Sequence, residues 1–559
     1  MSVFAARLIQ LQTIDGPAYA AQARDSRLRT VALPATRGDI LDTNGAPLAT
    51  TVDTVAIAAD PKFTAPVADQ IAGIVAPVLG VDTAGLLDKL NRPGTRFVYL
   101  ARQVDQGVWN RIRTSLATAG LRGVTSEADP MRSYPAGSTA ASIIGFTGTD
   151  TAGLVGRDGL EAGLNGLLAG KAGSQTFEVS ADGPALPLGD DSLTAPVAGT
   201  GVQLSIDRDL QFRAQQMLAE QVRRNRAESG DAIVMDVRTG QVVVMATAPT
   251  YDANAGARSP ADLRRDRPIS DSFEPGSVFK LVTASAALDQ GKVTPATREV
   301  VPAYLHRDGQ RIKDWWRHGT LRMTFAGAIA KSSNIGTILA ASQLSHEVQA
   351  DYLHRFGIGA PTGVPLPGEN TGSVPAAADW TGLTQATISF GQGVAVNALQ
   401  MASVVATVAN GGVRIPPQLV KGYVAADGTI TPAPAPVPTR VIQPQTAAQL
   451  MGIMQQVTAP SGTAPKVNIP GYVSAGKSGT AQRFDKGCRC YHNYTVSFAL
   501  AAPAEAPRYI AYVDLKNVGG AASGGGSAGP VAKKLLGAVL HANAVPPSTK
   551  VRTVLPLTW

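Results

Sequence analysis

Residues 274–280 read Glu-Pro-Gly-Ser-Val-Phe-Lys and open an apolar stretch that continues to residue 290 and stops at Gly291. The Pro-Gly pair predicts that Ser277 lies in the first turn of a helix, with Lys280 on the same helix face. A serine hydroxyl needs a neighbouring base to act as a nucleophile, and a lysine serves as that base when burial or nearby cations lower its pKa. The positive helix end also favours negative charge developing beside Ser277. Alone, this S-x-x-K pattern is equally compatible with an ordinary helix start.

Two further motifs follow along the chain. Ser332-Ser-Asn334 supplies a hydroxyl and an amide at a predicted break between two helices, although simple capping of the second helix would also explain it. Lys477-Ser-Gly-Thr480 supplies a second cation and further hydroxyls. A strand there would lay its backbone along an extended peptide substrate, with Gly479 allowing close approach, whereas a turn is the simpler alternative.

Other candidate catalytic patterns lack their partners. Residues 525–529 match G-x-S-x-G, but an α/β-hydrolase needs an acid and a histidine after Ser527, and residues 528–559 contain no Asp or Glu. The six histidines include no H-E-x-x-H, so a metallohydrolase is not supported and no metal site is predicted. Cys488 and Cys490 form a C-x-C in a predicted loop. They predict a strained disulfide or, less readily, a metal site with His492.

The composition and the hydrophobic pattern of the chain change near residue 200. Residues 26–200 are rich in Gly, Pro, Asp and Thr with short alternating apolar runs, which predicts a β-rich module with a few helices, one of them over 67–79. The later part predicts a strand over 202–206, a helix over 208–226, a hairpin about residues 238–240, helical segments over 277–290 and 323–344, strands over 494–500 and 509–515, and a closing helix over 529–544. Strands early and late around a helical middle indicate an α+β domain.

Composition narrows the class of protein. The 559 residues carry a net charge of +8 without a long basic run, so the sequence predicts no nucleic-acid partner. The apolar amino terminus is interrupted at Arg7 and Gln10, well short of the about 20 apolar residues of a membrane span. Residues 1–25 are therefore either a short amphipathic helix or the tail of a truncated membrane anchor.

The order S-x-x-K, S-x-N, K-S-G-T resembles that of the penicilloyl-serine transferases, which include β-lactamases and penicillin-binding proteins. Further segments resemble class B penicillin-binding proteins, although Thr43 stands where that family usually has arginine. These segments are 37–45 (Arg-Gly-Asp-Ile-Leu-Asp-Thr-Asn-Gly), 132–137, 144–146, 159–161, 170–173, 389–393, Asn397 and 400–401.

The resemblance implies an α+β penicilloyl-serine transferase fold, an antiparallel sheet with helices on both sides, behind an elongated pedestal. The expected divisions are a membrane-proximal helix over 1–25, a pedestal or dimerisation-type domain over 26–200, a transpeptidase domain over 201–545 and a tail over 546–559. It also implies that the protein is a peptidoglycan D,D-transpeptidase. Residues 145–150 and 356–359 resemble the septal type more than the elongation type.

The resemblance also implies a role for each motif residue. Ser277 would attack the D-Ala-D-Ala carbonyl, Lys280 would take its proton, Ser332 and Lys477 would relay a proton to the leaving nitrogen, and Asn334 would orient Lys280 and substrate. Backbone N–H groups of Ser277 and Thr480 would form the oxyanion hole. Ser478, Gly479 and Thr480 would bind the substrate, whose terminal carboxylate would be held by the Ser478 and Thr480 hydroxyls with Lys477 nearby. No metal or cofactor is implied.

The implied partners are stem peptides ending in D-Ala-D-Ala, β-lactam antibiotics, and a membrane glycosyltransferase with other division proteins. The implied location is the cell membrane, with one amino-terminal anchor and an extracytoplasmic catalytic domain. Three alternatives remain: a β-lactamase, a β-lactam sensor and an inactive scaffold. Residues 161–165 match the E-x-x-L-N of class A β-lactamases but precede Ser277 instead of following it, so we interpret that match as coincidence.

Overall fold

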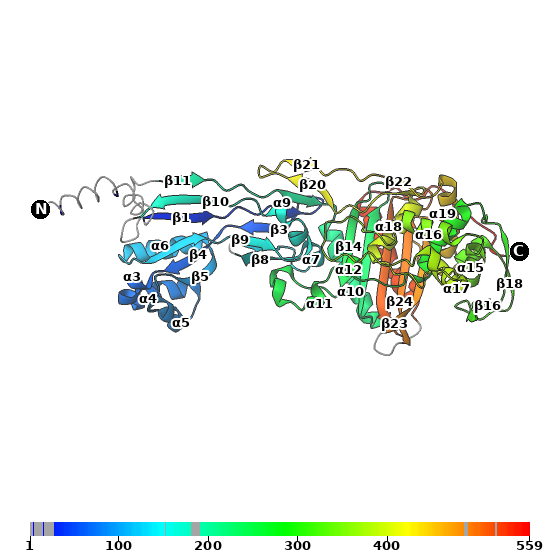
Figure 1. The fold of residues 1–559 in the computed structure, drawn as a ribbon, viewed down its shortest axis with the longest axis horizontal. Helices are drawn as coiled ribbons and strands as arrows, with labels where there is room; N and C mark the ends of the chain where they lie inside the picture. Colours follow the sequence, from blue (N-terminus) through cyan, green and yellow to red (C-terminus); the bar gives the residue numbers. More distant parts are fainter. Residues whose placement is uncertain are drawn as a thin grey trace.

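The computed structural model describes residues 27–150, 153–179, 191–485, 490–519 and 522–559, together with Phe4 and Asp15. The molecule is elongated, with the amino-terminal module at one end of its long axis and the carboxyl-terminal module at the other (Figure 1). Among the described residues, none of the helices combines the length and the apolar character that a membrane crossing requires.

Two sheets build the outer part of the pedestal. A three-stranded antiparallel sheet runs along the long axis, in the order β1 (Leu28–Leu33), β10 (Gly173–Glu178), β11 (Asp191–Thr194). A small lobe beside it has the strand order β5 (Val98–Asp105), β4 (Thr54–Ala59), β6 (Val124–Ala128), with helices α3 (Pro61–Thr64), α4 (Ala68–Leu79), α5 (Thr83–Leu90) and α6 (Gln106–Thr118). The lobe has its own core, in which Ile57, Ile71 and Trp109 are buried. Helix α4 confirms the helix predicted over 67–79.

A buried ion network accounts for most of the pedestal motifs. Arg37 is 1% exposed, and its Nε donates to Glu161 Oε2 at 2.5 Å. Arg132 Nε donates to Glu161 Oε1 at 2.7 Å, and its Nη2 donates to the carbonyl of Gly38 at 2.8 Å. Arg37 Nη1 also reaches Asn165 Oδ1 at 2.8 Å. Glu161 is thus the shared acceptor of two buried arginines. This gives the E-x-x-L-N match of residues 161–165 a structural explanation.

One sheet joins the two modules. Its strand order is β21 (Ile430–Pro432), β20 (Val420–Val424), β12 (Gly201–Leu204), β2 (Ile40–Leu41), β3 (Pro47–Val52), β7 (Met131–Ser133). The first three strands belong to the second module and the last three to the pedestal, and the parallel pairing of β12 with β2 joins them. At this junction Lys421 Nζ lies 3.3 Å from both the carbonyl oxygen and Oγ1 of Thr43. Class B penicillin-binding proteins usually have an arginine at the position of Thr43. Here Lys421 of the second module supplies a cation beside that position.

The second module is built on a five-stranded antiparallel sheet in the order β14 (Val242–Ala248), β13 (Ser229–Asp236), β25 (Tyr509–Val518), β24 (Cys490–Ala502), β23 (Ala475–Asp485). The predicted hairpin is confirmed as β13 and β14, and β24 and β25 extend beyond the strands predicted over 494–500 and 509–515. Alternate side chains enter two different cores: Ile233 and Tyr512 face one, and Ala232 and Val513 face the other.

Helices cover both faces of this sheet, as the α+β expectation requires. Helices α10 (Arg208–Asn225) and α20 (Gly529–Ala542) pack on one face. The larger helical group packs on the other face and includes α12 (Arg267–Ser270), α13 (Lys280–Asp289), α14 (Phe325–Ala330), α15 (Asn334–Ala341), α16 (His346–Arg355), α17 (Gly382–Ser389), α18 (Ala398–Ala409) and α19 (Pro444–Val457). Asp207 caps α10 by accepting from the backbone N–H groups of Asp209 and Leu210, as its position predicted.

The helical stretch predicted over 277–290 is confirmed, since a 3-10 turn over Gly276–Phe279 leads directly into α13. One predicted boundary was wrong, because residues 323–324 belong to β18 (Leu321–Thr324), which pairs with β15 (Arg298–Val301). The remaining short elements are α7 (Ala141–Ile144), α8 (Gly159–Gly163), α9 (Asn165–Leu168), α11 (Ala261–Arg264), β8 (Thr147–Asp150), β9 (Gly153–Gly156), β16 (Leu305–Arg307), β17 (Gln310–Ile312), β19 (Val413–Arg414) and β22 (Thr439–Arg440).

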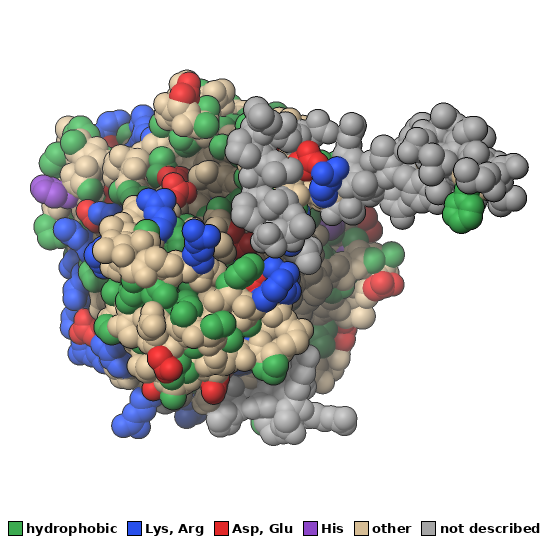
Figure 2. Space-filling model, turned by 90° about the vertical axis from the view of Figure 1, so that its left-hand side faces the viewer, with side chains coloured by type: hydrophobic (Ala, Val, Ile, Leu, Met, Phe, Trp, Pro, Cys, Tyr) green, Lys and Arg blue, Asp and Glu red, His purple; other side chains and the backbone are tan. Residues whose placement is uncertain are grey.

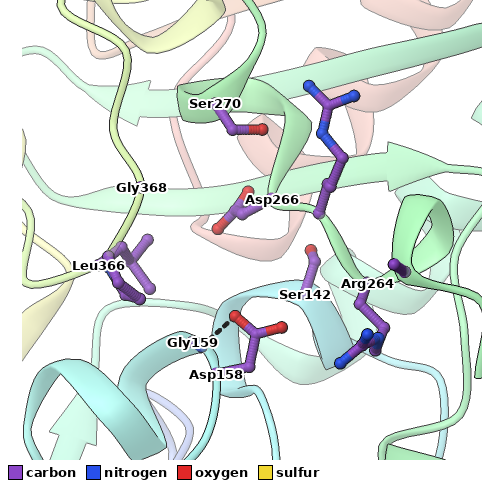
Figure 3. A pocket seen from close by; sticks show the side chains of 11 residues that line it. Ser142, Asp158, Gly159, Arg264, Asp266, Ser270, Leu366 and Gly368 are labelled. Atoms are coloured by element: carbon purple, nitrogen blue, oxygen red, sulfur yellow. Dashed lines mark hydrogen bonds between the residues drawn. The ribbon is translucent and has the colours of Figure 1, made fainter. Parts of the chain in front are cut away.

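A cavity of about 240 Å³ lies between the two modules. Ser142 and Asp158 line it from the pedestal, and Arg264, Asp266 and Ser270 line it from the second module (Figure 3). Asp266 is 9% exposed, and neither of its carboxyl oxygens has a hydrogen-bond partner among the described residues. On the pedestal end shown in Figure 2, basic side chains are spread among acidic and apolar ones.

Candidate active site

Ser277 lies in the 3-10 turn that leads into α13. It is half-buried, whereas its neighbours Pro275, Gly276, Val278 and Phe279 are buried, so the serine is the accessible side chain of this turn. Gly276 has a φ of +58°, and its N–H donates to the carbonyl of Gly391 at 2.9 Å. A Cβ at Gly276 would lie 3.0 Å from that of Ala481 on β23. The turn is therefore pressed between β23 and residues 389–393.

Lys280, one turn after Ser277, is fully buried. Its Nζ donates to the carbonyl of Ser332 at 2.7 Å and to Asn334 Oδ1 at 2.8 Å, and lies 3.4 Å from Ser332 Oγ. Burial, followed by the charge of Lys477, lowers the pKa of Lys280 well below its ordinary value. A buried lysine with a lowered pKa and three polar neighbours has the properties of a general base.

Ser332 lies between α14 and α15, where the sequence predicted a break. Its φ of +61° is in the left-handed region, which a residue other than glycine rarely adopts. Such backbone strain is often found at functional sites. The conformation presents the Ser332 carbonyl to Lys280 while the hydroxyl meets a second lysine. The next residues begin α15, with Ser333 as its cap through Gly336 N–H at 2.9 Å.

Lys477 brings the third motif to the same place. Its Nζ donates to Ser332 Oγ at 2.9 Å and to the carbonyl of Ser478 at 2.9 Å. The side chain is fully buried, and burial lowers the pKa of Lys477 to about 7. Ser332 therefore contacts two lysines, and the three sequence motifs meet through it.

The strand β23 closes the site. It is the last strand of the five-stranded sheet, so its outer edge is free of a strand partner in that sheet. A Cβ at Gly479 would lie 2.2 Å from Ser497 Oγ and 3.0 Å from Val278 Cγ2, so only glycine fits beside the turn that holds Ser277. Ser478 is half-buried and Thr480 is exposed. An exposed strand edge beside a serine suits an extended peptide substrate.

Sequence reasoning missed Asp314, which is 3% exposed. Its Oδ1 accepts from the N–H groups of Asn334 at 2.6 Å and Ile335 at 3.0 Å, and its Oδ2 accepts from Ser333 Oγ at 2.7 Å. His318 Nε2 lies 3.1 Å from the same carboxylate. Asp314 thus fixes the start of α15, and with it Asn334. The only sequence signal was an isolated acid before two tryptophans.

The other candidate residues lie elsewhere or have structural contacts. Ser527 is buried in a short π-helical turn over Gly524–Ala528, and its N–H donates to the carbonyl of Ser523. Asn397 and Gln400 form the capping box that starts α18. Cys490 is disulfide-bonded, whereas Cys488 and the side chain of His492 lie outside what the structure describes. The described part of the chain contains no group of three or more residues suited to hold a metal ion.

The fold and the arrangement of Ser277, Lys280, Ser332 and Lys477 define a serine enzyme of the penicilloyl-serine transferase class. Comparison with known proteins narrows this class. Residues 230–537 match the family of the penicillin-binding protein transpeptidase domain, and residues 32–204 match the penicillin-binding protein dimerisation domain.

Relatives and solved structures agree over nearly the whole chain. The chain is 35% identical to penicillin-binding protein PbpB of Mycolicibacterium smegmatis and 32% identical to peptidoglycan D,D-transpeptidase FtsI of Escherichia coli, matching 97% of this chain and 88% and 89% of those proteins. Penicillin-binding protein 3 of Mycobacterium tuberculosis in complex with ampicillin is 31% identical with a TM-score of 0.72, over 94% of this chain and 100% of the other. The chain therefore belongs to the class B penicillin-binding proteins, which are serine-type D,D-transpeptidases.

Proposed function

We propose that this chain cross-links peptidoglycan stem peptides through an acyl-enzyme on Ser277. Ser277 Oγ attacks the carbonyl between the two terminal D-alanines, the peptide bond breaks, and D-Ala leaves with a proton on its nitrogen. An amine of a neighbouring stem peptide then attacks the ester, which forms the cross-link and returns the proton to the serine. The observation that supports this proposal best is the contact of Ser332 with both Lys280 and Lys477.

We assign the proton transfers to that cluster. Lys280, with its lowered pKa, takes the proton of Ser277. Ser332 Oγ, at 2.9 Å from Lys477 Nζ, passes a proton to the leaving nitrogen. Asn334 Oδ1 holds Lys280 at 2.8 Å. The backbone N–H groups of Ser277 and Thr480 are assigned to the oxyanion, which is commonly the largest single contribution to acyl transfer.

We assign substrate recognition to β23. The free edge of the strand supplies backbone groups to the extended stem peptide, and the hydroxyls of Ser478 and Thr480 with Lys477 hold its terminal carboxylate. A β-lactam carries the same recognition elements and acylates the same oxygen. We expect the ester to persist, since Glu161 of the coincidental E-x-x-L-N match is bound by Arg37 and Arg132 in the pedestal and is not part of the Ser277 site.

We infer that the protein works at the division septum, anchored to the cytoplasmic membrane with its catalytic domain on the outer side. The support is its similarity to the peptidoglycan D,D-transpeptidase FtsI of Escherichia coli. The inferred partners are a membrane glycosyltransferase and other division proteins. A fluorescent fusion of the native gene product tests this: concentration at mid-cell supports the septal role, and a uniform lateral or cytoplasmic distribution contradicts it.

The test of the reaction uses a synthetic stem peptide ending in D-Ala-D-Ala and an excess of a D-amino acid as acceptor. We expect release of one D-Ala per exchanged peptide, and no release by Ser277→Ala. Hydrolysis without transfer would indicate a carboxypeptidase. Rapid turnover of penicillin in the same preparation would indicate a β-lactamase.

A further inference from the structure

A row of polar residues crosses the sheet beneath the turn that holds Ser277. Gly479 on β23 is paired with Ser497 on β24, Ser497 with Asp514 on β25, and Asp514 with Asp231 on β13. Asp231 and Asp514 alternate with Ala232 and Val513 of the opposite core, so they face the side of α18 and of Ser277. Both carboxylates are 0% exposed. Buried acids in an otherwise apolar sheet face need a specific partner.

Lys516 supplies that partner. It is 6% exposed, and its Nζ lies 2.6 Å from Asp231 Oδ2 and 3.1 Å from Asp271 Oδ2. Asp514 Oδ1 is 4.0 Å away. Burial lowers the pKa of Lys516, but the charges of Asp231, Asp514 and Asp271 outweigh burial and raise it, so the side chain is a permanent cation. Asp231 has no other ion pair in the part of the chain that the structure describes.

Asp271 begins the segment that ends in the nucleophile turn. Lys516 Nζ also lies 5.5 Å from the centre of the Phe273 ring. Phe273 exchanges two backbone hydrogen bonds with Val396, each of 3.0 Å, and Glu274 Oε1 accepts from Gly393 N–H at 2.8 Å. Residues 271–276 are thus fixed to the helical side at Phe273, Glu274 and Gly276, and to the sheet through Lys516.

We propose that Lys516 is a positioning residue for acylation: by joining Asp231 of the sheet to Asp271, it sets the position of the Ser277 turn over β23. The position of the Ser277 turn relative to β23 matters because Ser277 Oγ and the backbone of Thr480 on β23 act on the same carbonyl group. A displacement of about 1 Å at a reacting centre costs about 100-fold in rate. The proposal rests on the proposed function of Ser277.

The experiment measures acylation by benzylpenicillin in stopped flow, where saturation separates the acylation rate constant k2 from the dissociation constant Kd. Lys516→Met keeps the length of the side chain and removes its charge. We expect k2 to fall at least 10-fold with Kd changed less than threefold, and Tm to fall because Asp231 is left as an unpaired buried charge. In Lys516→Met/Asp231→Asn the carboxylate nearest to the missing ammonium is gone, and Asp271 keeps its ion pairs with Arg265 and Arg267, so Tm recovers in part while k2 stays low.

The matched control is Leu535→Ala on α20. Leu535 is fully buried in the core on the opposite face of the sheet, so its truncation lowers Tm without touching residues 271–276. Its k2 should stay within twofold of the unmodified chain. The proposal is overturned if the folded double variant acylates at the unmodified rate, or if Leu535→Ala slows k2 as much as Lys516→Met. If the unmodified chain is not acylated, it is the proposed function that fails.

Discussion

At the scale of single residues, Ser332 organises the site. Its hydroxyl contacts Lys477, its carbonyl contacts Lys280, and its left-handed backbone makes both contacts possible at once. The sequence identified all three residues because their motifs occur in a specific order. The positive φ of Ser332 and its simultaneous contacts with Lys280 and Lys477 could not be predicted, since they depend on residues far apart in the chain.

The first prediction concerns the base. We expect Lys280→Ala to slow acylation by penicillin by about 10²–10⁴, the usual effect of losing a general base. The substitution leaves Ser332 and Asn334 without their shared donor, so the circular-dichroism spectrum must be compared with that of the unmodified chain. A folded Lys280→Ala protein that acylates at the unmodified rate would assign the proton transfer to another group.

The second prediction concerns pH. In the proposed mechanism acylation requires Lys280 neutral and Lys477 charged, and burial lowers the pKa of Lys477 to about 7. Lys477 loses its charge as the pH rises through that value, so k2/Kd, which reports the free enzyme, should decline above about pH 7. Lys477→Arg keeps a cation at all these values and should lose this decline, even where its absolute rate is lower. A wild-type profile that stays flat from pH 6 to 9 contradicts the assignment.

At the scale of elements, helix starts were predicted where a capping residue is visible. Asp207 marks the start of α10 in both sequence and structure. The prediction over 323–344 missed strand β18 at the start of this segment. Residues 321–324 pair with β15, and a pairing between separate segments leaves no local signal. Asp314 was missed for the same reason: its three donors belong to a helix that begins twenty residues later in the chain.

The third prediction tests this cap. Asp314→Ala leaves Ser333 Oγ and the N–H groups of Asn334 and Ile335 without their acceptor. A buried donor left unpaired costs about 1–3 kcal/mol. We expect lower stability and slower acylation, since Asn334 holds Lys280. Asp308 is a matched control, because it accepts from Leu383 N–H at the start of α17. Asp308→Ala should lower stability without changing the acylation rate, and equal effects of the two variants on acylation would remove the special role of Asp314.

At the scale of the whole molecule, two modules share one sheet and one ion network. The sequence showed the change in composition and hydrophobic pattern near residue 200 and the motifs around Arg37 and Glu161. It did not show that β12 lies between β2 and β20, or that Lys421 approaches Thr43 across the junction. Such contacts join residues far apart in the chain, which local patterns do not encode.

The fourth prediction concerns the cavity between the modules. Burial, and then the charges of Asp231 and Asp158, raise the pKa of Asp266 well above its usual 3.8. The native protein therefore keeps this proton at pH values where the unfolded chain has released it, and stability falls as the pH rises above about 4. We expect Asp266→Asn to remove this component and to gain Tm over the unmodified chain between pH 4 and 8. The exposed Asp53→Asn should show no such gain. A Tm difference between Asp266→Asn and the unmodified chain that stays constant from pH 4 to 8 would contradict the assignment.

The most direct test of the account is the site of the covalent adduct. Intact-protein mass spectrometry after incubation with benzylpenicillin should show a single adduct, mapped by peptide analysis to the segment that contains Ser277, and Ser277→Ala should show none. The ester should persist for many minutes. An adduct on Ser527, or labelling of Ser277→Ala at the unmodified rate, would contradict the central claim that Ser277 is the nucleophile of this transpeptidase.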